Sequence, residues 1–329
     1  MKKILKLSIL SSVLFSSSLM ANNCEYFLGV SNDIEGQLFK YGKEVGLFNL
    51  VEKKYDCKLK ISENKNHKQT IYSLIANKQE VDGAILKNVD IHYNIGAVKQ
   101  LNNILLSKSN NLEVVSKNSK NLNSLNGQTI YLTKKTYMEY ALLDNLKDVG
   151  INKDNVNLVN VESEEKLIDG YSKGLYDNIL LENSMSNNLS GNKIKFKEAK
   201  YFSLVSTLER TENYSKKKEF IENITLELLK NIERDAGTEY NNLLTKIKET
   251  NNFKSTSEVK SIIKSMNFFN SKSNLDDLYE MEEKSYNYII SNKLNKYNLP
   301  YSIFINNKII GDKKSTYQMF YTNINVDNL

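Results

Sequence analysis

The amino-acid sequence predicts an α/β protein of two lobes, each a mostly parallel sheet flanked by helices, with a helical C-terminal region. A strand–helix–strand–helix–strand pattern occurs at 25–90 and again at 128–183, and such alternation produces parallel sheets with right-handed crossovers. The second halves of the repeats, 73–86 and 167–180, share the order helix, short turn, acidic residue and buried strand. The 329 residues, 40% hydrophobic and 26% charged, suit a two-domain globular protein.

The first repeat is expected to open on a strand and to contain two helices. Apolar residues within 36–54 recur at a spacing of three to four, which is typical of a helix. The expected elements are a strand at 25–30, a helix at 36–54, a strand at 57–62, a helix at 68–79 and a buried strand at 81–88.

The second repeat follows the same order. Its expected elements are a strand at 128–132, a helix at 136–150, a strand at 156–161, a helix at 163–174 and a strand at 176–183. Parallel strands place their carboxyl ends at one edge of a sheet, so the two lobes can face each other across a cleft at those ends.

Beyond about residue 205 the sequence predicts helices and no further strands. A segment at 202–207 resembles a strand that returns to the first lobe. Helices are expected at 215–233, at 255–266 with Ser255 or Ser257 as the N-cap, and at 274–294. The expected domains are a first lobe of 22–115 with 205–329 and a second lobe of 116–204, and the crossings fall near 115–117 and 203–206.

The N-terminus has the pattern of a secretory signal peptide at 1–21. Lys2, Lys3 and Lys6 surround the start of an apolar run, three serines follow it, and Ala21 precedes the expected cleavage. The alternative is an uncleaved N-terminal anchor. Loss of the three lysines lowers the formal charge from +6 to +3. This mild excess, spread along the chain, does not indicate a nucleic-acid partner.

Cys24 and Cys57 are the two cysteines of the chain, and each begins an expected strand. An even number of cysteines in an exported protein favours a disulfide. If the two strands are parallel neighbours, both cysteines lie at the same end of the sheet, about 5 Å apart. The alternative is two unpaired thiols.

The reactive residues indicate binding rather than catalysis. His67, in a polar loop, and His92 have no metal-ligand spacing, so no metal site is expected. The chain lacks the G-x-S-x-G elbow of serine hydrolases and the glycine-rich loops of nucleotide-binding proteins. We therefore expect no catalytic residue, no cofactor and no enzymatic activity; turnover of a bound molecule would contradict this expectation.

The turn at 133–139, between a strand and a helix, is the first candidate binding segment. Thr136 and Glu139 form the T-x-x-E pattern of a capping box. In that arrangement the Thr136 side chain accepts from the Glu139 N–H, and the Glu139 carboxylate accepts from the Thr136 N–H. Thr133 and Tyr137 lie beside them, and Tyr137 is a candidate wall of the site. The alternative is an ordinary helix cap without ligand contact.

Polar and acidic residues also follow the other expected strands. These candidate ligand-binding residues are Asn32, Asp33, Asn88, Asp90, Glu162, Glu182 and Asn183. Each by itself is equally consistent with a solvated turn or a cap. Together they indicate a ligand rich in N–H donors, such as an amide, guanidine or amine, because buried donors require acceptors.

Several segments resemble the periplasmic solute-binding proteins of ABC importers, in the nitrate/sulfonate/taurine group. The segments that carry the resemblance are 40–61, 71–86, 125–161 and 165–183. The tail at 304–324 is similar to the branch associated with urea carboxylase. The ordered series covers roughly 25–235 well and the remainder loosely.

The resemblance implies a type II periplasmic-binding-protein-like fold and a monomer in the periplasm. It implies a small-molecule ligand, held in the cleft by hinge closure, and ABC permease transmembrane subunits as partners. The expected ligand is a small nitrogen-containing solute. A sulfonate, nitrate or a pyrimidine vitamin precursor remain alternatives, as does a sensory or scaffold module without transport.

Overall fold

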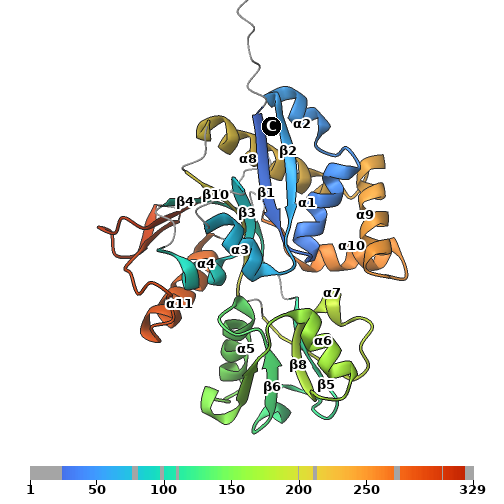
Figure 1. Cartoon of the computed structure of the whole chain (residues 1–329), viewed down its shortest axis with the longest axis vertical. Helices are drawn as coiled ribbons and strands as arrows, with labels where there is room; N and C mark the ends of the chain where they lie inside the picture. The colour runs from blue at the N-terminus through green and yellow to red at the C-terminus, as the bar shows by residue number, and fades with distance from the viewer. Residues whose placement is uncertain are drawn as a thin grey trace, which may run out of the picture.

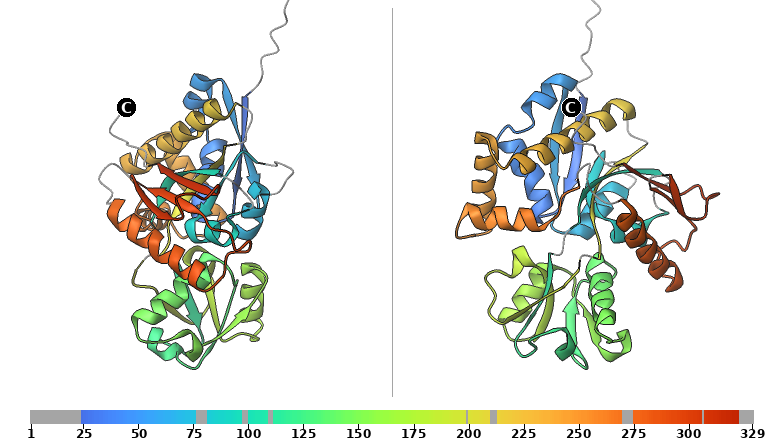
Figure 2. Two further views of the ribbon diagram at one scale, coloured as in Figure 1. Left: turned by 90° about the vertical axis from the view of Figure 1, so that its left-hand side faces the viewer. Right: turned by 180° about the vertical axis from the view of Figure 1, so that it is seen from behind.

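The computed structural model describes residues 24–322, except 76–80, 97–99, 109–110, 199, 210–212, 270–274 and 306. Figure 1 shows two lobes, one above the other, and Figure 2 shows them from the side and from behind. Each lobe contains a sheet flanked by helices, so the predicted fold class is confirmed. The expected signal peptide lies outside the described residues. Among the described residues, no helix is both long and apolar enough to cross a membrane.

The first lobe is built on an eight-stranded sheet of order β12-β11-β13-β4-β10-β3-β1-β2. β1 pairs in parallel with β2 and β3, whereas β10 pairs antiparallel with β3 and β4. The strands are β1 Cys24–Val30, β2 Cys57–Glu63, β3 Gly83–Lys87, β4 Gln100–Ser107, β10 Ser203–Leu208, β11 Ser302–Ile305, β12 Lys308–Gly311 and β13 Gln318–Thr322.

The prediction that strands stop near residue 205 was wrong. β11, β12 and β13 extend the first sheet beyond β4, and β13 pairs in parallel with it. Ile303 and Met319 are fully buried, so these strands complete a core that begins far upstream in the sequence.

The predicted disulfide is confirmed. β1 and β2 are parallel neighbours whose register places Cys24 opposite Cys57. The two cysteines form a disulfide with a Cα–Cα distance of 4.4 Å.

The expected helix at 36–54 is two helices, α1 Ile34–Glu44 and α2 Asn49–Tyr55. Gly46 lies between them with φ +85°, a conformation that glycine adopts without steric cost. The resulting turn buries Phe48 completely. A continuous helix would lack this turn.

Helices cover both faces of the first sheet. On one face, Ile85 and Val205 pack in a core with α1, α8 Tyr214–Arg234, α9 Thr238–Thr250 and α10 Thr256–Ser265. On the other face, Leu86 and Leu204 pack with α3 His67–Ile75, α4 Asn88–Asn94 and α11 Leu275–Ser291. Adjacent residues of one strand thus serve opposite cores, as the pleat requires. Ser255 is the N-cap of α10 and accepts from the Glu258 N–H at 3.2 Å. Neither α4 nor α9 was predicted.

The second lobe is built on a five-stranded sheet of order β7-β6-β8-β5-β9. Its strands are β5 Leu112–Ser116, β6 Thr129–Leu132, β7 Asn157–Asn160, β8 Asn178–Glu182 and β9 Asn192–Lys195, and its helices are α5 Tyr137–Asp148, α6 Glu164–Ser172 and α7 Asn183–Ser186. The chain passes between the sheets after β4 ends at Ser107 and returns before β10 begins at Ser203. The exact domain limits stay a prediction.

The topology brings four strand ends together between the lobes. β1 and β3 are parallel in the first sheet, and β6 and β8 are parallel in the second. Their carboxyl ends face each other at the junction of the lobes in Figure 1. Residues that follow these strands are therefore positioned to meet.

Candidate binding site

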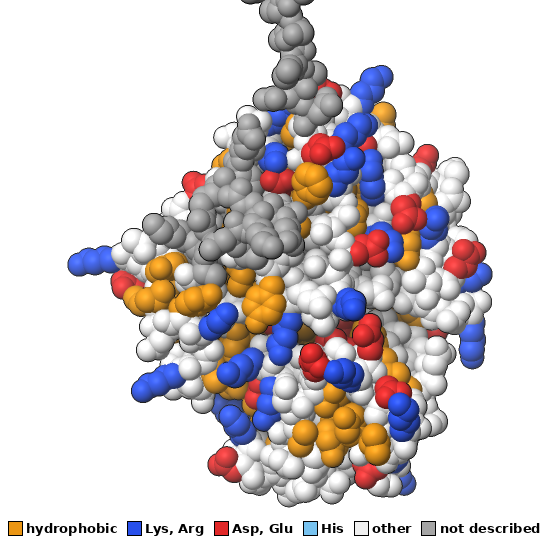
Figure 3. All heavy atoms as spheres, viewed as in Figure 1, with side chains coloured by type: hydrophobic (Ala, Val, Ile, Leu, Met, Phe, Trp, Pro, Cys, Tyr) orange, Lys and Arg blue, Asp and Glu red, His pale blue; other side chains and the backbone are white. Residues whose placement is uncertain are grey.

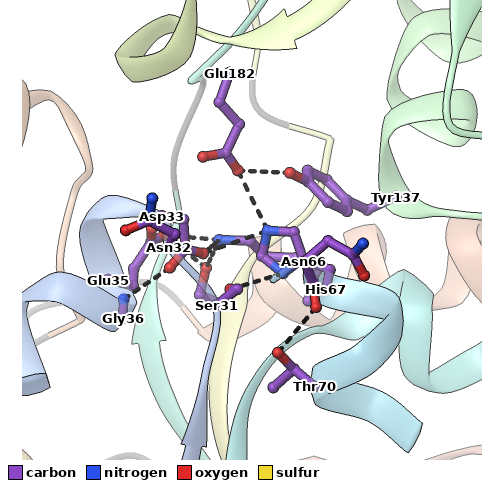
Figure 4. A network of polar contacts seen from close by, with 12 residues as sticks. Ser31, Asn32, Asp33, Glu35, Gly36, Asn66, His67, Thr70, Tyr137 and Glu182 are labelled. Carbon is purple, nitrogen blue, oxygen red and sulfur yellow. Dashed lines mark hydrogen bonds and ion pairs between the residues drawn. The ribbon is translucent and has the colours of Figure 1, made fainter. Parts of the chain in front are cut away.

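A buried group of ionisable side chains occupies the junction of the two lobes; we call it the central cluster. It consists of Asp33, Glu35, His67, Lys87 and Glu182, all of which are buried. The first four come from the ends of β1 and β3 and the starts of α1 and α3, whereas Glu182 ends β8 of the second lobe. Figure 4 shows His67 between Asp33 and Glu182. The cluster therefore joins the two lobes through charged groups.

Lys87 is the buried cation of the cluster, with only 1% of its surface exposed. Its ammonium donates to Glu35 Oε1 at 3.0 Å and to Ser203 Oγ at 2.9 Å, and lies 3.2 Å from Asp33 Oδ2. It also faces the Tyr137 ring, with its Nζ 5.7 Å from the ring centroid. Burial lowers the pKa of Lys87, but the charges of Glu35 and Asp33 outweigh burial and hold that pKa well above its usual value.

His67, the first residue of α3, lies between carboxylates of the two lobes. Its Nε2 is 3.4 Å from Asp33 Oδ2 and 3.6 Å from Glu182 Oε1, and its Nδ1 is 3.3 Å from Ser31 Oγ. Burial lowers the pKa of His67, but Glu182 and Asp33 outweigh burial and raise it to about 9. The imidazole is therefore a cation at neutral pH.

Glu182 is the contribution of the second lobe to the cluster. The Tyr137 hydroxyl donates to Glu182 Oε1 at 2.5 Å, and the Tyr137 ring meets the His67 ring edge-on at 5.0 Å. Burial raises the pKa of Glu182, but His67 and Lys87 outweigh burial, so its pKa is lowered. Burial and the charge of Glu182 hold the Tyr137 pKa well above its usual value, so this phenol stays a hydrogen-bond donor.

The start of α5 is capped across the junction. Asp90 of α4 accepts from the Tyr137 N–H at 2.6 Å. Burial raises the pKa of Asp90 to about 6, although the charge of His67 opposes this shift. Asp90 satisfies a donor that helix starts leave free, so it performs the role that an N-cap side chain usually performs.

The predicted capping box between Thr136 and Glu139 is absent. The Thr136 hydroxyl donates to the Thr133 carbonyl at 2.7 Å, and the Glu139 carboxylate accepts from the Lys135 N–H at 2.7 Å. Lys135 has φ +58°, a left-handed backbone conformation, so the backbone that leads into α5 is not extended throughout. The capping box expected from the sequence is thus replaced by Asp90, a cap from the other lobe.

A pocket of about 470 Å³ adjoins the central cluster and is formed by both lobes. Its walls come from α3, α4, the start of α5 and the segment after α11. Residues with charged or polar side chains in the lining are His67, Lys68, Asp90, Asn94, Lys135, Thr136, Lys293, Asn295 and Lys296. Lysines gather at the lobe junction on the face shown in Figure 3, with acidic side chains among them. The pocket therefore combines a basic rim with Asp90 and His67.

The structure brings some of the predicted site residues together and leaves others apart. Asp33, Asp90, Tyr137 and Glu182 meet at the junction, and Thr136 lies in the pocket. Their role in ligand binding stays a prediction.

Six predicted residues make other contacts. Asn32 is exposed and accepts from Gln37, Asn88 is fully buried against Glu282, and Glu162 is exposed and paired with Lys166. Thr133 and Glu139 hold the turn described above, while the Asn183 N–H donates to the Asn111 carbonyl.

Sequence reasoning missed His67 and Lys87, whereas Glu35 was noted among the acids that follow the first strand. A lysine inside the apolar segment GAILK signals a buried cation that requires carboxylate partners. His67 was assigned to a polar loop, yet Asn66 accepts from the Gln69 N–H at 3.0 Å, which starts α3 at His67. The N-x-x-Q spacing at 66–69 is a usable signal for that helix start.

Comparison with known proteins supports the fold. No protein-family model and no curated protein matches the chain. Among solved structures, the alkanesulfonate-binding protein SsuA from Xanthomonas axonopodis pv. citri, bound to MOPS, aligns with TM-score 0.65 at 11% identity, over 82% of this chain and 94% of its own. The periplasmic aliphatic sulphonate-binding protein SsuA from Escherichia coli gives TM-score 0.61 at 13% identity, over 83% and 94%.

A third match is a zinc-bound ligand-binding component of an ABC-type import system from Staphylococcus aureus. It has TM-score 0.59 at 12% identity, over 84% of this chain and 94% of its own. The chain thus has the two-lobed α/β fold seen in periplasmic solute-binding proteins of ABC importers. At these identities the matches establish the fold alone.

Proposed function

We propose that the protein is the exported substrate-binding component of an ABC importer. It captures one small polar solute between its lobes and delivers it to the transmembrane subunits of a permease. The fold supports this class, and the observation that carries the proposal is the central cluster, because His67 and Glu182 meet there from opposite lobes. A solute that contacts both lobes stabilises the closed form over the open form.

The junction has the contacts expected of a closing cleft. On one side, Val89 and Tyr93 of α4 share an apolar core with Met138 of α5. Beside it lie the Asp90 cap and the ion pairs of His67. The apolar contacts between α4 and α5 favour lobes that stay together on that side. Where the charged groups meet, the lobes can separate, and water then solvates those groups.

The proposed solute is a small nitrogen-containing compound with several N–H donors. Asp90 lines the pocket, and Glu182 and Asp33 lie beside it around His67. Buried carboxylates accept from amines and guanidines through strong charge-assisted hydrogen bonds. The tail resemblance to the urea-carboxylase-associated branch agrees with such a solute and stays a prediction.

A second candidate solute is a sulfonate. Lys68, Lys135, Lys293 and Lys296 line the same pocket, and a ring of ammonium groups attracts an anion. Two of the structural matches are sulfonate-binding proteins by name. Because Asp90 already occupies the Tyr137 N–H, the helix start contributes less to anion binding than a free one would.

A thermal-shift screen of the purified protein separates the two candidates. Guanidine, small amines and amides form one panel, and alkanesulfonates with nitrate form the other. A solute at 100 times its dissociation constant should stabilise the protein by about 2.7 kcal/mol, a shift of a few degrees. Amine binding should weaken in Asp90→Asn and persist in Lys135→Gln. Sulfonate binding should persist in Asp90→Asn and weaken in Lys135→Gln.

Closure and transport require their own measurements. Small-angle scattering should show a smaller radius of gyration with the bound solute, and mass spectrometry should recover that solute unchanged. Solute uptake by vesicles that carry the permease would support transport. Binding without uptake would favour the alternative of a sensory or scaffold module. The absence of a thermal shift with either panel would contradict the proposed solute classes.

A further inference from the structure

We propose that Asp33, His67 and Glu182 form a binding site for a divalent first-row transition-metal ion, of which zinc is the best representative. The three side chains lie in the central cluster and come from both lobes. The site stands on these side chains alone, so it does not depend on the solute that the protein transports.

The geometry of the three groups suits one small ion. One ligand atom from each residue lies within 4.8 Å of the other two. His67 Nε2 is 3.4 Å from Asp33 Oδ2 and 3.6 Å from Glu182 Oε1. Ligands at zinc bond lengths form tetrahedral edges of about 3.3–3.5 Å. Two edges of the site therefore already have nearly the spacing that a tetrahedral ion requires.

An oxygen of Asp33 is directed into this site without a hydrogen bond. Asp33 is 4% exposed, and its Oδ1 accepts from the Gly36 N–H at 2.7 Å. Its Oδ2 accepts no hydrogen bond among the described residues and is held only by the ion pairs with Lys87 Nζ at 3.2 Å and His67 Nε2 at 3.4 Å. A metal ion that replaces the His67 proton would give this buried oxygen a directed bond in addition to its ion pair with Lys87.

Outer contacts orient the proposed ligands. Ser31 Oγ lies 3.3 Å from His67 Nδ1, which leaves Nε2 toward the carboxylates. The Tyr137 hydroxyl donates to Glu182. Metal-binding imidazoles and carboxylates usually have such partners, which fix the ring orientation and strengthen binding. These contacts leave a fourth ligand position to water or to a solute.

The charge of the central cluster also favours a divalent cation. It holds three carboxylates, from Asp33, Glu35 and Glu182, and the ammonium of Lys87. To bind an ion, His67 releases its proton to water and acts as the neutral imidazole; the remaining groups then carry two negative charges, which one divalent cation balances. Lys87 shares Asp33 Oδ2 with the ion and thereby limits the affinity.

The proposed ion would hold the two lobes together. Asp33 and His67 belong to the first lobe and Glu182 to the second, so the complete ligand set exists in the closed form. Metal binding and closure should therefore be linked, and scattering of the metal-loaded protein should report the closed form.

Cobalt(II) titration tests the site directly. After chelator treatment, the purified protein should bind one equivalent of cobalt with the visible bands of a tetrahedral ion, and zinc should displace it. His67→Ala and Glu182→Gln should abolish these bands. Tyr137→Phe should weaken binding about 10–100-fold, since it removes an outer contact. Glu165→Gln, an exposed residue of the second lobe, is the matched control and should leave the titration unchanged.

Several results would overturn the site. They are the absence of tetrahedral bands in the wild type, bands that persist in both ligand variants, or equal loss in Glu165→Gln. Circular dichroism establishes whether each variant is folded, and Glu182→Gln preserves side-chain shape if His67→Ala does not fold. Cobalt binding without any response to the solute panels would support the metal site while contradicting the proposed solute.

Discussion

Replacement of Lys87 by methionine tests whether the central cluster is a dry, mutually dependent set of charges. Methionine preserves an unbranched stem and removes the ammonium. In the wild type that ammonium lies 3.0 Å from Glu35 Oε1 and 3.2 Å from Asp33 Oδ2, and all three side chains are at most 4% exposed. Breaking a buried ion pair by removing one partner costs about 3–5 kcal/mol, because the other charge stays buried without compensation. We expect Lys87→Met to lose stability within this range.

The second step of this test restores the charge balance. Glu35 Oε1 also accepts from the hydroxyls of Ser203 at 2.8 Å and Ser107 at 3.2 Å, so Glu35→Gln retains hydrogen-bonding partners. The double variant Lys87→Met/Glu35→Gln should recover most of the lost stability. A double-mutant cycle then isolates the interaction between the two charges.

Urea denaturation followed by circular dichroism at pH 7 measures these differences. Lys173→Met is the matched control, since Lys173 forms an exposed pair with Asp169 on α6. Exposed pairs of this spacing contribute about 0.3–0.5 kcal/mol. If Lys87→Met costs no more than this control, the carboxylates are hydrated and the reasoning about a buried cluster is refuted.

Three further predictions follow from named contacts. Asp90→Asn should stabilise the protein increasingly with pH, because burial raises the folded pKa of Asp90 to about 6 and makes its ionised form costly above that pH, although the charges of His67 and Lys87 oppose this shift. Its advantage in urea denaturation should rise from about 1.5 kcal/mol at pH 5 to about 3 kcal/mol at pH 8, and a constant difference would contradict the assigned pKa. Reduction of the disulfide should cost about 3–4 kcal/mol, given its separation of 33 residues, and an unchanged midpoint would reject that contribution. Ser255→Ala should cost about 1 kcal/mol in the same assay, while Ser257→Ala should cost clearly less; equal costs would count against Ser255 as the cap.

Much of the fold could be predicted because its strands and helices carry local signals. The apolar strands and periodic helices of both repeats lie close to their expected ranges, and the cysteines share one register position. β4, β5 and β9 were missed, and β11, β12 and β13 lie in a tail where no strands were expected. Their identity as strands depends on pairing with segments far away in the sequence, which periodicity does not report.

Residues of the candidate site were predictable only where a polar or acidic side chain follows the end of an expected strand. Asp33, Asp90, Tyr137 and Glu182 were found in this way. The capping box failed because the cap of α5 comes from Asp90, a residue of the other lobe. His67 was passed over because its partners, Asp33 and Glu182, are distant in the chain, so no local spacing marks the group as metal-ligating. Local patterns identify where helices start, whereas the packing of the two lobes determines which residues meet at their junction.

The charge of the junction links the two proposals and predicts which ligands drive closure. Asp33, Glu35 and Glu182 face two cations, Lys87 and the protonated His67, so the central cluster retains one uncompensated negative charge. Asp90 adds a further acid beside it at pH values above about 6. Because buried net charge is costly, the closed form gains more from a cation than the solvated open form does. An amine, a guanidine or a divalent metal ion that enters the cluster should therefore shift the population toward the closed form. An anion held at the lysine rim leaves the buried negative charge uncompensated, so it would stabilise the closed form only through its own contacts to both lobes.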